Sequence, residues 1–221
     1  MKSLLLALLA TFAPAHVAPL APVVIAVSLD NREKSSVVVD FPTPELFFIQ
    51  IRDAHGHAVF DTRTGHKPIP VTRTVTFPKG VTRLSSFTWD TLGDERRSLE
   101  AGAYVVHVEM QTSTSTLVAD SPLTIEPPAT IASILAAPSP APQTIAGTPE
   151  RHGPVMFLRD ESGEVALSRP LGILPRGRFI VRGLLERNND GTHFLIERFA
   201  PAAGNLDPQG TPTPRASATP K

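Results

Sequence analysis

Two predicted strands and the loop between them decide the fold, and they occupy the stretch Phe87-Thr88-Trp89-Asp90-Thr91-Leu92-Gly93-Asp94-Glu95-Arg96-Arg97-Ser98-Leu99-Glu100-Ala101-Gly102-Ala103-Tyr104-Val105-Val106-His107-Val108. The first strand ends at Trp89-Asp90, a charged loop follows, and the second strand begins after Gly102. Trp89 and Tyr104 are the single tryptophan and the single tyrosine of the chain. Neighbouring strands of an antiparallel sandwich have this pattern, with one large aromatic side chain at the end of each. The stretch therefore predicts a β-sandwich, and it contains no catalytic signature.

Residues 22–126 have the same strand pattern throughout. Short runs rich in β-branched and aromatic residues recur about every ten residues, with turn residues between them, as in a β-sandwich. No window of this segment has a convincing helical period. We expect strands over Val23–Val27, Ser36–Phe41, Leu46–Arg52, Ala58–Phe60, Val71–Phe77, Val81–Trp89, Ala103–Glu109 and Thr116–Ile125.

Residues 143–200 form a second, smaller strand-rich segment. Asn188-Asn189-Asp190-Gly191 is a strong hairpin turn signal. Four or five strands in about 55 residues fit a small barrel of the oligonucleotide/oligosaccharide-binding (OB) type. The predicted strands are Pro154–Arg159, Glu164–Leu167, Gly177–Leu185 and His193–Arg198.

Three further segments are expected outside these two domains. A positive start, an apolar run and small residues up to Ala15 are typical of a secretory signal peptide, assigned to residues 1–20. Residues 127–142 carry five prolines among Ala, Ser and Thr and predict a semi-stiff linker. Residues 201–221 carry five more prolines and predict a disordered tail. We therefore expect export to the periplasm, the cell envelope or the extracellular space, without stable membrane insertion.

The segment from Asn31 to about Gln111 resembles the BsuPI-type intracellular proteinase inhibitors. The shared pattern is an Asn after the first strand, a turn like Phe77-Pro78-Lys79-Gly80, and a terminal signature of Trp-Asp followed by Gly-x-Tyr. That signature falls on Trp89, Asp90, Gly102 and Tyr104. The resemblance implies an immunoglobulin-like fold and a non-catalytic, inhibitor-like function. The predicted fold class is all-β: an immunoglobulin-like antiparallel β-sandwich followed by a small OB-like β-barrel.

The signature residues also have a physical interpretation as stabilising groups. Asp90, directly after a strand, can accept backbone N–H bonds in the following turn. Gly102 permits a backbone angle that other residues avoid, so the next strand can start sharply. Tyr104 can bury its ring while its hydroxyl stays hydrogen-bonded at the edge of the sandwich. We expect these residues to hold the fold rather than to bind a ligand.

Little in the chain points to chemistry, and we expect neither an enzyme nor a cofactor. The chain has no cysteine nucleophile and no sequence motif of a hydrolase, a phosphate loop or a metalloprotease. His55 and His57, with His66 nearby, are the nearest approach to a metal cluster, but they lie in polar turns, so no metal site is predicted. His107 is expected to face solvent.

Nucleic acid is also not an expected partner. The chain has 21 basic and 21 acidic residues, so it has no overall field to attract a polyanion. The aromatic residues of the predicted barrel occupy alternating strand positions, where a small core would use them. They are Phe157, Phe179, Phe194 and Phe199.

The sequence thus favours an exported, non-catalytic binding protein whose partner is a protease, in the first instance a subtilisin-like serine protease. A loop at the end of the sandwich would occupy the protease cleft sterically and resist cleavage because the scaffold holds it rigid. Loops 61–70 and 91–100, expected at opposite ends of strands, are the first to test. A structural or adhesive module of the cell envelope is the alternative, and capture of a small ligand or oligosaccharide by the barrel is a third.

Overall fold

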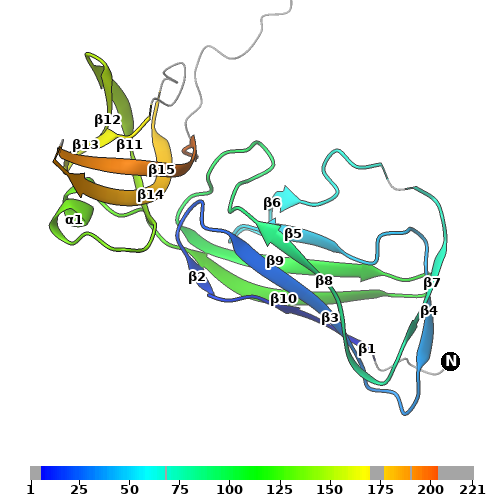
Figure 1. The fold of residues 1–221 in the computed structure, drawn as a ribbon. Coiled ribbons are helices and arrows are strands. Elements are labelled where there is room, and N and C mark those ends of the chain that lie inside the picture. The colour runs from blue at the N-terminus through cyan, green and yellow to red at the C-terminus, as the bar shows by residue number, and fades with distance from the viewer. Residues whose placement is uncertain (1–5, 68, 170–176, 190, 204–221) are drawn as a thin grey trace, which may run out of the picture.

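The computed structural model describes residues 6–67, 69–169, 177–189 and 191–203. It has two bodies made almost entirely of strands, a long sandwich and a small barrel at one of its ends (Figure 1). This confirms the predicted all-β class. The helices within the described residues fall short of the length and apolarity that a membrane span requires.

The sandwich has two main sheets and a short strand pair at the end away from the barrel (Figure 1). The first sheet has the order β1-β3-β8, with β1 at Leu6–Thr11, β3 at Val23–Asn31 and β8 at Gly80–Trp89. The second has the order β2-β10-β9-β5-β6, with β2 at His16–Val17, β10 at Thr116–Ile125, β9 at Gly102–Gln111, β5 at Phe48–Arg52 and β6 at Ala58–Asp61. The pair consists of β4 at Val37–Phe41 and β7 at Arg73–Phe77.

The sandwich core lies between the two sheets. On β3, every second residue from Val23 to Leu29 is fully buried, because side chains alternate between the two faces of a strand. Val106 and Met110 on β9 are also fully buried in this core, and Trp89 closes it at the end of β8. The strand predictions for residues 22–126 are confirmed to within a few residues at each end.

The prediction that residues 1–20 lie outside the fold is wrong. β1 pairs antiparallel with β3 along its whole length, from Leu6 opposite Asn31 to Thr11 opposite Ala26. Leu8 is buried in the sandwich core, and the Ser121 hydroxyl donates to the Ala10 carbonyl at 3.0 Å. An apolar run of Leu and Ala fits both a signal peptide and a strand that covers a core, and composition alone does not separate them.

The second body is a closed five-stranded barrel, as predicted. Its strands follow the order β11-β12-β13-β15-β14, with β11 at Gln143–His152, β12 at Val155–Asp160, β13 at Gly163–Leu167, β14 at Phe179–Asn188 and β15 at Gly191–Pro201. β14 and β15 form the predicted hairpin, with Asn188 opposite Gly191. Gly183 lies at a bulge in β14, where a Cβ atom would overlap the Leu195 carbonyl, so the close packing of this hairpin requires glycine.

The predicted linker over residues 127–142 is also corrected by the structure. Helix α1, Ile131–Ala136, lies inside it, and both of its isoleucines are buried in the barrel core. The Thr130 side chain accepts the Ser133 N–H at 3.2 Å, and the Asp160 carboxylate accepts the Ile131 N–H at 2.9 Å. The proline content predicts a linker, but the segment contains a short capped helix that is part of the barrel.

The barrel is packed against the sandwich rather than tethered to it. A small set of apolar residues from both bodies forms a common core, here called the junction cluster: Leu20, Leu92, Ala146, Ile180, Ala200 and Ala202. The Thr144 hydroxyl donates to the Pro19 carbonyl at 2.9 Å, and the Ser98 N–H donates to the Pro201 carbonyl at 3.0 Å. Of the predicted tail, 204–221 lies outside the described residues, whereas Pro201 ends β15 and Ala202 is buried.

Candidate functional site

Trp89 and Tyr104, two residues of the predicted structural signature, are both buried in the sandwich core. The indole of Trp89 is 1% exposed, and its Nε1 donates to the Leu92 carbonyl at 2.9 Å. The Tyr104 ring is buried, and its hydroxyl donates to the Glu100 carbonyl at 2.9 Å, four residues upstream. Burial, followed by the charges of Glu100 and Asp53, raises the pKa of Tyr104. Both aromatic residues thus anchor the two ends of the loop between β8 and β9.

Asp90 and Gly102 flank the same loop. Asp90 faces Arg96 across it, with Oδ2 and Nη1 3.5 Å apart. The neighbouring Thr91 is fully buried, has a φ of +59°, and accepts the Leu20 N–H at 2.6 Å through its hydroxyl. Gly102, with a φ of +157°, opens β9. Thr91 is a residue that sequence reasoning missed, because nothing in the sequence brings residue 20 to residue 91.

The loop that these residues hold, residues 91–98, is here called the tip loop. It is a compact turn in which the Gly93 N–H donates to the Arg97 carbonyl at 3.0 Å and the Arg96 N–H donates to the Gly93 carbonyl at 2.9 Å. Its ends are buried at Leu92 and Ser98. Its charged side chains project outward, with Glu95 81% and Arg96 78% exposed. The loop therefore presents a charged surface on a fixed backbone.

A second loop, residues 61–66, lies against the tip loop and is here called the flanking loop. Asp94 joins the two: its carboxylate accepts the Asp61 N–H at 3.2 Å and the Thr64 hydroxyl at 2.8 Å, and its own N–H donates to the Val59 carbonyl at 3.0 Å. The expectation that loops 61–70 and 91–100 lie at opposite ends of strands is therefore wrong. The structure brings them together at one end of the sandwich.

The flanking loop is held by its own charged network. The Asp61 carboxylate accepts hydrogen bonds from the Arg63 backbone and guanidinium and, at 2.7 Å, from Gln50. Burial favours the neutral form of Asp61, but these hydrogen bonds outweigh it and hold the pKa of Asp61 below its ordinary value. The Arg63 guanidinium also lies 5.4 Å from the Phe48 ring centroid, in cation–π contact.

A cleft of about 470 Å³ lies between the two loops. Its wall includes Phe60 and Phe87, whose rings stack at 5.8 Å, and the charged rim includes Asp94 and Arg96. An apolar floor with a polar rim is the usual composition of a protein-binding surface. The end of the sandwich thus combines a rigid exposed loop with an adjacent apolar recess.

The histidines do not form a metal site within the described part of the chain, where no three His, Cys, Asp or Glu residues converge. His55 and His57 lie in a turn held by Asp53, whose Oδ1 accepts the backbone N–H of each at 2.9 Å. His66 lies apart from them, in the flanking loop. The expectation of an exposed His107 is wrong: it is 6% exposed, with Nδ1 2.6 Å from Asp120 Oδ1, because it lies between Gln50 of β5 and Asp120 of β10 on the same face of the sheet.

The four barrel phenylalanines divide into two pairs. Phe179 and Phe194 are buried in the barrel core, as predicted. Phe199, by contrast, is 42% exposed, and Phe157 is half-buried and packs against His152 at 5.0 Å. The core assignment is therefore wrong for Phe157 and Phe199, since strand alternation places them on the side away from the barrel interior.

A β-sandwich that carries a hydrogen-bonded loop beside an apolar recess at one end has the features of a binding surface. Residues 13–115 match the family model described as BsuPI, intracellular proteinase inhibitor, which confirms the resemblance. An inhibitor family implies a non-catalytic protein with a proteinase-inhibitor-like function and a protease as its partner.

Three solved structures are also similar to parts of this chain, each at low sequence identity. An alkylpurine DNA glycosylase, AlkC, from Pseudomonas fluorescens bound to DNA containing an abasic site analog is 14% identical at a TM-score of 0.33, over 55% of this chain and 30% of that chain. A β-glucosidase from Listeria innocua in complex with gluconolactone is 11% identical at a TM-score of 0.32, over 55% of this chain and 16% of that chain. Spo0M, a sporulation control protein from Bacillus subtilis, is 12% identical at a TM-score of 0.38, over 81% of this chain and 79% of that chain. The chain thus spans under a third of the first two, and no curated protein matches it.

The predicted export, with a signal peptide and a periplasmic, cell-envelope or extracellular location, is wrong. The matching family is described as intracellular, and the residues assigned to the signal peptide form β1 and β2 of the sandwich. The proline-rich spacer and the predicted tail are the features that favour the envelope-module alternative. Residues 131–136 of the spacer form α1, which removes the first support, whereas residues 204–221 of the tail lie outside the described residues.

Proposed function

We propose that the tip loop and the flanking loop form the inhibitory surface of this protein and occupy the cleft of a subtilisin-like serine protease. The observation that carries this proposal is the double attachment of Asp94, which ties two exposed loops into one unit at the barrel end of the sandwich. The mechanism is steric. The loops fill the cleft of the protease without placing a peptide bond in position for hydrolysis.

Rigidity is what separates an inhibitor loop from a substrate loop. A protease binds substrates as extended strands, and a flexible loop would pay an entropic cost to bind and would then be cut. The tip loop is closed by its own backbone hydrogen bonds, tied to the flanking loop through Asp94, and anchored at Thr91 and Ser98. This supports slow cleavage together with binding that needs little further ordering.

The experiment is an inhibition titration with the full chain. Increasing protein is added to a subtilisin-like serine protease that hydrolyses a chromogenic peptide anilide, and the inhibition constant is compared with that of Asp94→Ala. Loss of the Asp94 contacts, at about 1–1.5 kcal/mol, should weaken inhibition about tenfold. The variant should also be cleaved faster in the tip loop.

Asp40→Ala is the matched control. Asp40 is an exposed aspartate on β4 that accepts the Thr74 hydroxyl at 2.6 Å, at the end of the sandwich far from the tip loop (Figure 1). The Asp40→Ala variant loses the same kind of hydrogen bond outside the proposed inhibitory surface, so it should inhibit the protease like the wild type. A wild-type chain that leaves the protease fully active in molar excess would sink the proposal.

A further inference from the structure

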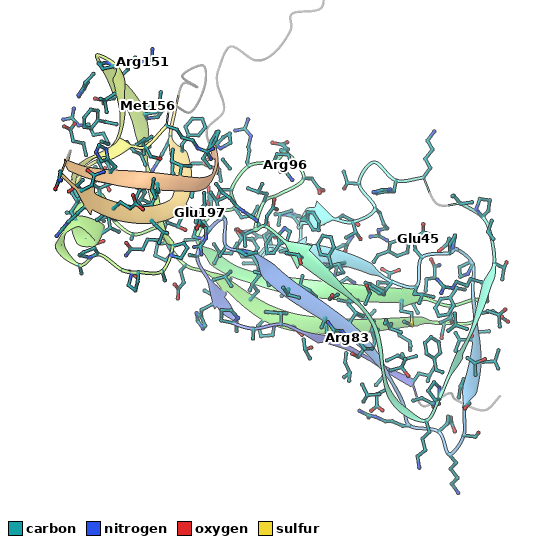
Figure 2. All side chains as sticks on the ribbon, in the orientation of Figure 1. Glu45, Arg83, Arg96, Arg151, Met156 and Glu197 are labelled. Atoms are coloured by element: carbon teal, nitrogen blue, oxygen red, sulfur yellow. The ribbon has the colours of Figure 1, made fainter. Side chains whose placement is uncertain are left out.

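A groove of about 420 Å³ lies between the tip loop and the barrel. Leu92 and Arg96 line it from the sandwich side, and Arg169, Arg198 and Phe199 line it from the barrel side. Figure 2 shows the tip-loop residue Arg96 close to the junction where Glu197 of β15 lies, whereas Arg151 is at the far tip of the barrel. The groove and the inhibitory surface share Arg96, so a partner on the tip loop is within reach of the barrel.

The barrel wall of the groove carries an exposed aromatic ring. Phe199 is 42% exposed, although its neighbours Ala200 and Ala202 are buried in the junction cluster. Its ring lies 6.5 Å from that of the buried Phe179, so it rests on the barrel core and is not free to swing away. Aromatic residues that line a recess are among those that contribute most to binding energy at protein interfaces.

The charges of the groove leave a cationic surplus. Its two acidic residues already face arginines: Asp90 lies 3.5 Å from Arg96, and Glu197 lies 3.9 Å from Arg182. Within the described residues, no carboxylate lies within ion-pair distance of Arg198 or Arg169. Arg198 is also directly opposite Arg182 in the β14–β15 ladder, and like charges at such a position disfavour each other. A carboxylate from a partner would relieve that repulsion.

The two walls are fixed relative to each other. The junction cluster packs behind the groove, and the Ser98 N–H, at the base of the tip loop, donates to the Pro201 carbonyl at 3.0 Å, two residues from Phe199. A groove with fixed walls needs little reorganisation to bind. Tip loop and barrel edge therefore act as one surface.

We infer that the barrel supplies a second contact for the protease partner: a partner segment with an apolar side chain beside a carboxylate lies in the groove, with its apolar group on Phe199 and its carboxylate on Arg198. The inference rests on the proposed inhibitory function and adds the chemical character of the partner surface. It gives the barrel a role in affinity that the sandwich alone lacks.

The test compares Phe199→Ala and Arg198→Glu with matched variants elsewhere on the barrel. The inhibition constant toward the subtilisin-like protease should rise about tenfold for Phe199→Ala, as for a hot-spot aromatic residue. Arg198→Glu should slow association and lose the salt dependence of the wild type, because it reverses the charge that attracts the carboxylate. The controls Phe157→Ala and Arg151→Glu, which lie outside the groove, should inhibit like the wild type.

The outcomes separate the two proposals. If the wild type does not inhibit, the proposed function fails, and this inference fails with it. If the wild type inhibits and Asp94→Ala weakens it, but Phe199→Ala and Arg198→Glu inhibit as well as the wild type, the barrel makes no contact and only this inference is overturned. Circular dichroism melting curves of all variants establish that the barrel is folded. Arg198→Glu changes an exposed side chain and keeps the test valid if Phe199→Ala does not fold.

Discussion

The sandwich core and the junction cluster are both apolar, but they are built from different side chains. The sandwich core contains large residues that are almost fully buried, among them Trp89, Phe41, Phe77 and Met110. Three of the six residues in the junction cluster are alanines. The stabilisation from burial scales with the apolar area removed from water, so the large side chains of the sandwich core contribute most of its stability. At the junction, where the side chains are small, hydrogen bonds contribute a larger share of the stability. The junction is thus the less strongly stabilised of the two cores.

The largest expected effect is in the sandwich core. Trp89→Ala should lower the free energy of unfolding by about 3–5 kcal/mol, because it empties a fully buried site and removes the hydrogen bond to the Leu92 carbonyl. Urea unfolding followed by circular dichroism measures it. Trp89→Phe, which keeps most of the apolar volume, should lose clearly less. An equal loss for both variants would contradict the volume argument.

A smaller effect is expected in the junction cluster. Leu92→Ala should cost about 2 kcal/mol, at the low end for a buried leucine, because its neighbours are small and the site can close. It should also weaken protease inhibition, since Leu92 anchors the tip loop. Leu92→Met conserves volume and should restore both stability and inhibition. If inhibition stays unchanged in Leu92→Ala, the loop does not depend on the junction for its position.

One hydrogen bond at the junction should contribute less again. Thr144→Val keeps the shape of the side chain but removes the bond from its hydroxyl to the Pro19 carbonyl, at a cost of about 1 kcal/mol. The same urea experiment measures the loss. Thr74→Val, which removes an exposed hydroxyl bond to Asp40, is the control and should cost less. A cost in Thr144→Val no greater than in this control would mean that hydrogen bonds do not hold the junction.

The smallest effect is a pH dependence present in both bodies. Hydrogen bonds lower the pKa of Asp61 in the sandwich and of Asp160 in the barrel against the opposing effect of burial. A carboxyl whose pKa is lower in the folded state adds stability above its unfolded pKa of about 4, and that stability is lost as the pH falls through the folded value. Asp61→Asn and Asp160→Asn should each flatten the loss of stability below pH 4. Unchanged acid unfolding in both variants would contradict this assignment.

Much of the fold could be predicted because strand alternation is a local signal. The pattern around Trp89 and Tyr104 correctly gave β8 and β9, and the turn at Asn188 correctly gave the β14–β15 hairpin. The errors lie where one composition fits two structures. β1 has the composition of a signal peptide, and α1 lies in a proline-rich stretch whose two buried isoleucines are too few to show a helical period.

The candidate site was harder to predict, because it depends on contacts between residues far apart in the sequence. Loop polarity pointed to residues 61–70 and 91–100, but only the fold brings Asp94 to Asp61 and Thr64. The junction is invisible in the sequence for the same reason. Residue 20 meets residue 91, and residue 98 meets residue 201, across separations that no local pattern encodes.

The pairing of β1 with β3 has a practical consequence for anyone who produces this protein. A truncated chain that starts at residue 21, on the assumption of a cleaved leader, would lack the edge strand of the first sheet. The backbone of β3 would then be bare along one side, and the apolar groups under Leu8 would meet water. An unpaired edge strand of this kind pairs with strands of other chains. The shortened chain should therefore form multimers or inclusion bodies, whereas the full-length chain should not.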